Sequence, residues 1–201
     1  MEKSFFMEVM DMSLSDANIW YPLFMQTMRV NQISKRQERL FFLSAIMTHS
    51  KSFTQLVDNM DYSCVELKAN CTPKMTAYQC EMLGRTLKQS AKGKAIANLY
   101  YYQYNGNTLP NDGWTYRPRG VLPAIGMDTY RNIGRAFNVD LIEHPELLEA
   151  PALAMRAAGW LWRMREAGKL DSLGQISYLF NADKRIYNKN FQWIVSVESK
   201  L

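Results

Sequence analysis

Apolar residues recur at every third or fourth position along most of the chain, and this spacing predicts amphipathic helices. Helices are expected over residues 4–10, 17–30, 35–50, 63–69, 76–89, 92–103, 127–137, 151–167 and 170–180. A turn is expected at residues 145–148, a turn or short helix at 53–58, and a helical or extended segment at 191–197. Because no stretch of any length alternates between apolar and polar residues, the sequence predicts a mainly α fold.

The segment 35–50 is expected to be the central helix. Ser34 is a good N-cap, and Gln37 three residues later completes the outline of a capping box. Six apolar residues give this helix a wide buried face: Leu40, Phe41, Phe42, Leu43, Ile46 and Met47. A loop rich in glycine, proline and asparagine is expected at 105–119, and loops of this length are usually functional or mobile. No repeat or linker interrupts the pattern, so residues 1–201 are expected to form a single domain.

Composition places the chain among ordinary globular proteins, with 47% hydrophobic and 21% charged residues over 201 positions. The formal net charge is +5, a modest basic excess that suits polyanionic partners such as nucleic acid, anionic lipid or a bacterial wall. Because no run of five basic residues occurs, nucleic acid is not expected as a partner.

The three cysteines, Cys64, Cys71 and Cys80, match no zinc or disulfide framework and are expected to be reduced thiols. With only two histidines in the chain, neither a metal site nor a cofactor is expected. The N-terminal segment contains Glu2 and Glu8 and lacks the apolar core of a signal peptide. No segment approaches 18 apolar residues, so no membrane span is expected. Reduced thiols and the lack of a signal peptide together predict synthesis in the cytoplasm.

Four stretches stand in order along the chain: LFFLSAIMTHSKSFTQLVDNMDYS (40–63), GKAIANLYYYQYNGN (93–107), NDGWTYRPRGVLPAIGMDTY (111–130) and NVDLIEHPELLEAPALAMRAAGW (138–160). Together they resemble the chitinase-like endolysins of glycoside hydrolase family 19, particularly the compact phage and prophage forms. The resemblance implies a lysozyme-like helical domain with two lobes and a central cleft. It also implies a β-1,4-linked N-acetylated glycan ligand, peptidoglycan or chitin. Release of such a protein to the periplasm or cell wall by a holin or another export route would fit the absence of a signal peptide.

Family members use an inverting mechanism, in which one carboxylic acid protonates the leaving oxygen and a second carboxylate activates water, roughly 6.5–9.5 Å away. The acid is the glutamate of the family's HES motif, and His49 stands at that position. The base lies nine positions later, where this chain has Asp58 followed by Asn59. The base therefore keeps a carboxylate on a shorter side chain, and the acid loses its carboxylate.

A protonated His49 is an alternative acid, because an imidazolium has a pKa of about 6.5 and donates protons near neutral pH. A protonated His49 would also tend to pair with Asp58 and quench the base. The favoured interpretation is therefore that His49 is a polar residue that lines the cleft and has no catalytic role. Glu38 and Glu66 are weak substitutes. Glu38 is eleven residues before position 49, roughly 16 Å along a helix, and Glu66 is expected to be exposed.

Other cleft positions also depart from the family: Pro118, Pro123, Ile125, Thr129, Ala182 and Asp183 replace family residues. Trp114, Tyr116, Arg119 and Asn181 match the family and are the candidate substrate-binding residues. The Trp114 and Tyr116 rings are expected to stack on sugars or, as the favoured alternative, to pack within their own loop.

Three functions follow as hypotheses. The favoured one is a pseudoenzyme that binds a glycan or an unidentified protein. The alternative is an active peptidoglycan hydrolase of muramidase or chitinase type, with Asp58 as base and His49 or another group as acid. The third is an interaction protein that reuses the fold, because a fold does not determine a function.

Overall fold

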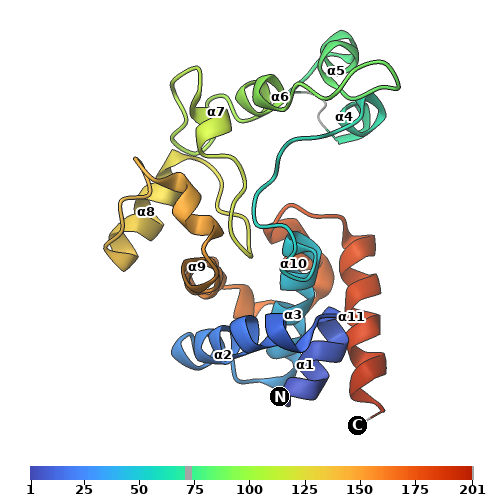
Figure 1. Ribbon diagram of the computed structural model, residues 1–201, viewed down its shortest axis with the longest axis vertical. Helices are drawn as coiled ribbons and strands as arrows, with labels where there is room; N and C mark the ends of the chain where they lie inside the picture. The colour runs from blue at the N-terminus through green and yellow to red at the C-terminus, as the bar shows by residue number, and fades with distance from the viewer. Residues whose placement is uncertain (71–73, 201) are drawn as a thin grey trace. The chain divides into compact units, whose positions relative to one another are not determined.

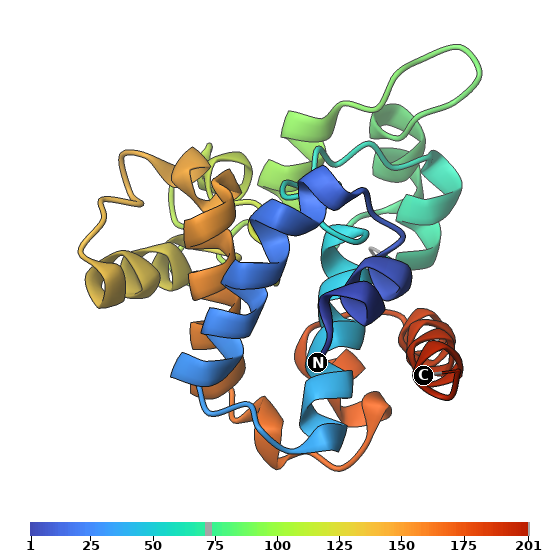
Figure 2. The same ribbon diagram turned by 60° about the horizontal axis from the view of Figure 1, so that its bottom comes forward.

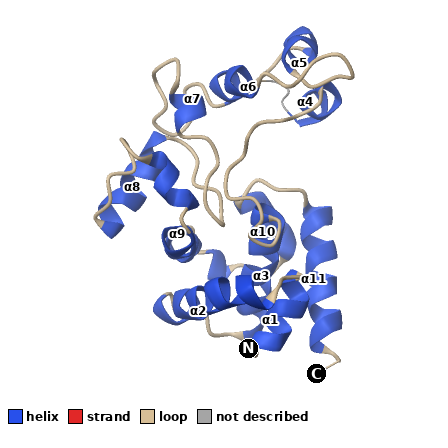
Figure 3. Cartoon of the chain, viewed as in Figure 1, coloured by secondary structure: helices blue, strands red, loops and turns tan. Residues whose placement is uncertain are grey.

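The helices predicted by the apolar spacing account for nearly all the regular structure in a computed structural model that describes residues 1–70 and 74–200 (Figure 1). Within these residues the only β pairing consists of isolated bridges, so the mainly α fold class is confirmed (Figure 3). Cys71 lies outside the described residues. None of the helices in the described ranges has both the length and the hydropathy needed to cross a bilayer.

The chain divides into two compact units. Unit 1 contains residues 1–56, 120–123 and 147–201, and unit 2 contains residues 57–119 and 124–146. The helices of unit 1 are α1 (Lys3–Met10), α2 (Leu14–Val30), α3 (Arg36–Ser50), α9 (Pro151–Met164), α10 (Leu173–Leu179) and α11 (Lys184–Glu198), with a 3₁₀ turn η2 at Ala167–Lys169. The helices of unit 2 are α4 (Cys64–Asn70), α5 (Ala77–Leu83), α6 (Gly93–Tyr100), α7 (Asp112–Thr115) and α8 (Met127–Phe137). A further 3₁₀ turn, η1, covers Pro145–Glu149. The single domain over 1–201 and the central cleft stay predictions.

Helix α3 is the buried centre of unit 1, as its apolar face predicts. It packs against α10 and α11, while α2 packs against α9 (Figure 2). Phe42 is fully buried, and its ring lies 5.9 Å from that of Phe24 on α2 and 5.1 Å from that of Trp162 on α9. Burial of large rings on three helices supplies much of the driving force for this core.

The predicted capping box at Ser34 is wrong. Helix α3 begins at Arg36, and its N-cap, Lys35, makes no side-chain cap hydrogen bond. The Gln37 amide instead donates to the backbone oxygen of Asp171, 3.3 Å away. A contact between residues far apart in the sequence has therefore replaced the local one.

The core of unit 2 is a cluster in which Met60, Leu67, Cys80 and Ile96 are almost completely buried. The helix predicted over 76–89 ends at Leu83 instead. A Cβ atom on Gly84 would lie 2.5 Å from backbone atoms of Cys64, so the chain approaches α4 where only glycine fits.

After Gly84 the chain leaves the helix and forms backbone hydrogen bonds with the start of α4. The Arg85 N–H donates to the Tyr62 oxygen at 2.8 Å, and the Cys64 N–H donates to the Arg85 oxygen at 3.2 Å. Close approach and pairing between α4 and α5 thus decide where α5 ends.

The end of α6 and the start of α10 also differ from the prediction, and local backbone conformation or capping explains each difference. Helix α6 stops at Tyr100, and Gln103 and Asn105 have left-handed backbone conformations. Helix α10 begins at Leu173 because Ser172 and Gln175 form a capping box. The segment 191–197 is helical within α11.

Candidate functional site

The candidate acid and base positions fall in different units. His49 lies in the last turn of α3 in unit 1, and Asp58 lies just before α4 in unit 2. Of the candidate substrate-binding residues, Asn181 is in unit 1, and Trp114, Tyr116 and Arg119 are in unit 2. The surroundings of each position determine which chemistry it supports.

The His49 side chain projects from α3 and packs against the end of α10 and against α11. Its Nε2 atom lies 2.9 Å from the hydroxyl oxygen of Tyr187, a residue of α11 that is completely buried. The imidazole ring also meets the Phe180 ring edge to face at 6.0 Å. The neighbouring Thr48 hydroxyl accepts a hydrogen bond from the Asn190 amide at 2.9 Å. The end of α3 is thus bound to α11 by two side-chain hydrogen bonds.

This environment keeps His49 neutral. Burial, and secondarily the positive charge of Arg165, lowers the pKa of His49 from 6.5 to about 4. At pH 7 the imidazole is then mainly neutral. Burial also raises the pKa of the Tyr187 hydroxyl, so the partner of His49 is neutral as well. A neutral imidazole hydrogen-bonded to a buried phenol is a poor proton donor to a glycosidic oxygen.

Asp58 organises the turn that follows it. Its Oδ1 atom accepts from the Met60 N–H at 2.7 Å, and its Oδ2 atom accepts from the Tyr62 hydroxyl at 2.6 Å. Met60 has φ of 55°, so the carboxylate stabilises a left-handed turn that few residues adopt. Each carboxylate oxygen has a second lone pair, and the side chain is half-buried rather than enclosed. A ligand or water molecule therefore still has acceptor sites on Asp58.

Arg117 joins Asp58 to Trp114. Its Nε atom donates to the Asp58 backbone oxygen at 3.0 Å, and Nη1 donates to the Trp114 backbone oxygen at 2.8 Å. Its guanidinium carbon lies 3.8 Å from the centre of the Trp114 ring, in cation–π geometry. Sequence reasoning missed this residue, although it stands between two residues singled out in the WTYRPRG stretch.

Tyr116 and Arg119 are almost completely buried. The Tyr116 hydroxyl donates to the Ile142 backbone oxygen at 3.2 Å. The pKa of this hydroxyl is raised, mainly by burial. Arg119 donates through Nη1 to the Thr115 backbone oxygen at 2.6 Å. Both arrangements agree with the packing interpretation, and glycan binding by these two side chains stays a prediction.

Asn181 is exposed just after α10, with φ of 55°. Two residues later, the Asp183 side chain accepts from the Arg185 N–H at 2.8 Å and caps α11. The aspartate that departs from the family pattern therefore begins the helix that covers His49.

The two glutamates considered as substitute acids have structural partners. Glu38 accepts a hydrogen bond from the Trp162 indole at 3.2 Å. Glu66 accepts from the Ser63 N–H at 2.7 Å at the start of α4, and hydrogen bonds from Ser63 lower its pKa. A glutamate with a lowered pKa is ionised at neutral pH and does not donate a proton.

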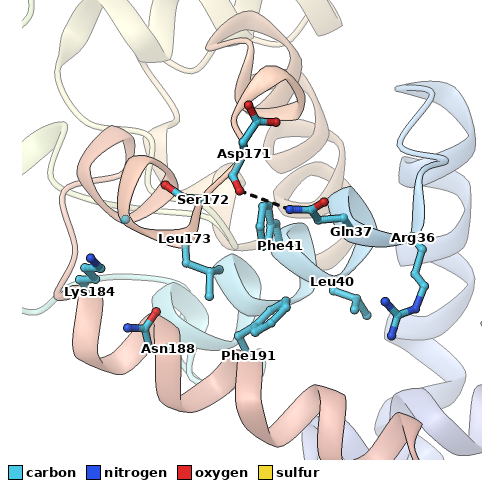
Figure 4. A pocket seen from close by; sticks show the side chains of 11 residues that line it. Arg36, Gln37, Leu40, Phe41, Asp171, Ser172, Leu173, Lys184, Asn188 and Phe191 are labelled. Carbon is cyan, nitrogen blue, oxygen red and sulfur yellow. Dashed lines mark hydrogen bonds between the residues drawn. The ribbon is translucent and has the colours of Figure 1, made fainter.

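A pocket of about 430 Å³ lies in unit 1 between α3, the start of α10 and α11. Leu40, Phe41 and Phe191 contribute apolar side chains to it (Figure 4). Among its polar lining residues, Gln37 donates a hydrogen bond to the Asp171 backbone oxygen, as Figure 4 shows. Among the described residues, no group of three or more His, Cys, Asp or Glu side chains could hold a metal ion.

Comparison with known proteins supports the family resemblance. No family model matches the chain. A "Glycosyl hydrolase family 19 domain-containing protein" of Haemophilus influenzae is 27% identical over 151 residues, which cover 74% of this chain and 72% of that protein. "Chitinase-like protein 2" of Arabidopsis thaliana is 44% identical over 66 residues, 32% of this chain and 20% of that protein. The similarity to the Haemophilus protein extends over most of both chains, so the chain is similar to a glycoside hydrolase family 19 domain over most of its length.

Proposed function

We propose that this protein is a non-hydrolytic relative of glycoside hydrolase family 19, a pseudoenzyme that acts by binding a peptidoglycan or chitin-like glycan. The observation that carries the proposal is the state of His49. At the position of the family's acid, the side chain is neutral, hydrogen-bonded to the buried Tyr187 and part of the packing between α3 and α11.

Glycoside cleavage by inversion needs a proton for the leaving oxygen while a carboxylate removes a proton from the attacking water. Asp58 keeps the chemical type required for the second step. Nothing on α3 supplies the first step, because Glu38 is hydrogen-bonded to Trp162 three turns earlier in the helix. With only one of the two groups, the rate acceleration that general acid catalysis provides, typically 10²–10⁴-fold, is lost.

The proposal is tested with dye-labelled peptidoglycan sacculi and with chitin oligosaccharides, using the native protein and the variants His49→Glu and Asp58→Asn. The expected result is no release of dye or reducing ends by the native protein. Sedimentation with insoluble peptidoglycan or chitin is expected for the native protein and for Asp58→Asn alike. Hydrolysis by His49→Glu alone would further support a lost acid.

An active hydrolase with Asp58 as its base is the second candidate, favoured by the acceptor sites that the half-buried carboxylate retains. Hydrolysis by the native protein that disappears in Asp58→Asn would establish this function and overturn the proposal. Absence of both hydrolysis and glycan binding would also overturn it, and would leave a protein partner as the ligand.

A further inference from the structure

A groove of about 950 Å³ lies in unit 1 along the second half of α2 and the loop that leads into α3 (the loop is visible in Figure 2). Its floor is aliphatic and includes Met25, Met28 and Ile33, of which Met28 is 5% and Ile33 3% exposed. Its rim carries Arg29 and Arg39. The groove shares no residue with the pocket of Figure 4, and it takes no part in the function proposed above.

The lining of the groove combines apolar side chains with a net positive charge. Its described lining contains two arginines and no carboxylate, and neither Arg29 nor Arg39 forms an ion pair with a described residue. The adjacent N-terminus of α3 has no side-chain cap on Lys35, so the positive end of its dipole adds to the charge. Glu38, the acid in this first turn, accepts its hydrogen bond from Trp162.

The lining selects among anionic partners. It contains no aromatic ring, so it offers nothing for a sugar or a nucleic acid base to stack on. Methionine side chains are flexible and polarisable, and they adapt to the leucine-like side chains of a peptide. Arginine pairs with carboxylates through two parallel hydrogen bonds.

We propose that this groove is a docking site for an acidic peptide segment of a protein partner. An aliphatic side chain of that segment lies on Met25 and Met28, and its carboxylates pair with Arg29 and Arg39. Charge complementarity and the aliphatic floor together distinguish this occupant from a glycan.

The test uses a fluorescein-labelled ten-residue peptide of glutamate and leucine, with binding followed by fluorescence anisotropy. Matched peptides carry glutamine in place of glutamate, or serine in place of leucine. The acidic peptide is expected to bind, and the two matched peptides to bind at least about fivefold more weakly. High salt is expected to weaken binding, because Arg29 is exposed and Arg39 is only half-buried.

Two protein variants locate the binding. The double variant Arg29→Gln/Arg39→Gln is expected to bind the acidic peptide about fivefold or more weakly than the native protein does. Its circular dichroism spectrum is expected to be unchanged. Arg135→Gln is the matched control, because Arg135 is exposed near the end of α8 in unit 2 and outside the groove. It is expected to bind as the native protein does.

Three results would overturn the proposal. The first is equal binding of the acidic and glutamine peptides, and the second is native affinity in the double arginine variant. The third is loss of chitin oligosaccharide or single-stranded oligonucleotide binding in that variant while peptide binding is retained. The last result would assign the groove to a different class of ligand.

Discussion

Acidification is expected to destabilise the protein through His49. Its pKa is about 4 in the folded state and 6.5 when exposed, so between these values the unfolded chain binds the proton and the folded chain does not. The stabilisation is complete above pH 6.5 and is lost as the pH falls toward 4. A difference of 2.5 pKa units (6.5 − 4) at about 1.4 kcal/mol per unit corresponds to about 3 kcal/mol.

The assay is urea unfolding followed by tryptophan fluorescence at pH 7, 6, 5 and 4.5. The His49→Gln variant keeps an amide that can hydrogen-bond to Tyr187 but does not titrate, so its free energy of unfolding should fall less with acidification. Carboxylates titrate equally in both proteins, and the difference between the two curves therefore isolates the imidazole. The control is His144→Gln, because the chain's other histidine has a side chain that is 63% exposed and lies in unit 2, outside the core that surrounds His49.

Two outcomes would refute this reasoning. One is a His49→Gln variant whose unfolding free energy falls with pH as steeply as that of the native protein. The other is a nuclear magnetic resonance titration in which the His49 ring protonates near pH 6.5. Either result would mean that the ring is hydrated, and the main argument against a catalytic imidazolium would be lost.

Three substitutions test the packing of each unit by urea unfolding. Asp112→Ala should lower the free energy of unfolding by about 2 kcal/mol, because the nearly buried carboxylate accepts hydrogen bonds from two backbone N–H groups at 2.8 Å. Asp112→Asn should lower it less. An alanine variant as stable as the native protein would contradict this. Gly113→Ala should lower the free energy of unfolding by about 2 kcal/mol, because the new Cβ atom would lie 2.4 Å from the Ala97 oxygen. In the control Gly174→Ala, the new Cβ atom meets only the flexible side chain of Lys184, and stability should not change. Lys51→Gly should stabilise by about 0.5–1 kcal/mol, because Lys51 ends α3 with φ of 47°; a loss of stability would show that the lysine has a contact of its own.

The ends of helices show where local sequence is sufficient. The capping box that begins α5 at Thr76 and the proline that opens α9 are local signals, and the sequence places both starts closely. The end of α5 before Gly84 depends on the approach of α4, and the Gln37 side chain at the start of α3 binds Asp171 instead of capping its own helix. Such contacts are invisible to a pattern that considers only neighbouring residues.

The candidate site divides in the same way. The sequence identifies histidine and aspartate at the positions of the family's acid and base, but not Arg117, whose role depends on the folded positions of Asp58 and Trp114. Likewise, the chemistry of WTYRPRG left stacking on sugar and packing in the loop as alternatives for Tyr116. The hydroxyl contact with Ile142, 26 residues away, agrees with packing.

The amino-acid sequence by itself determined the mainly α fold, the central buried helix and the absence of a carboxylate at position 49, because these depend on residue type and spacing. Only the tertiary structure decided the protonation state of His49, since the pKa of an imidazole depends on the groups that exclude water from it. Those groups include Tyr187, 138 residues later in the chain, and the positive charge of Arg165 lowers the pKa further. The apolar groove with two arginines likewise exists only because folding brings together α2, its loop and the first turn of α3.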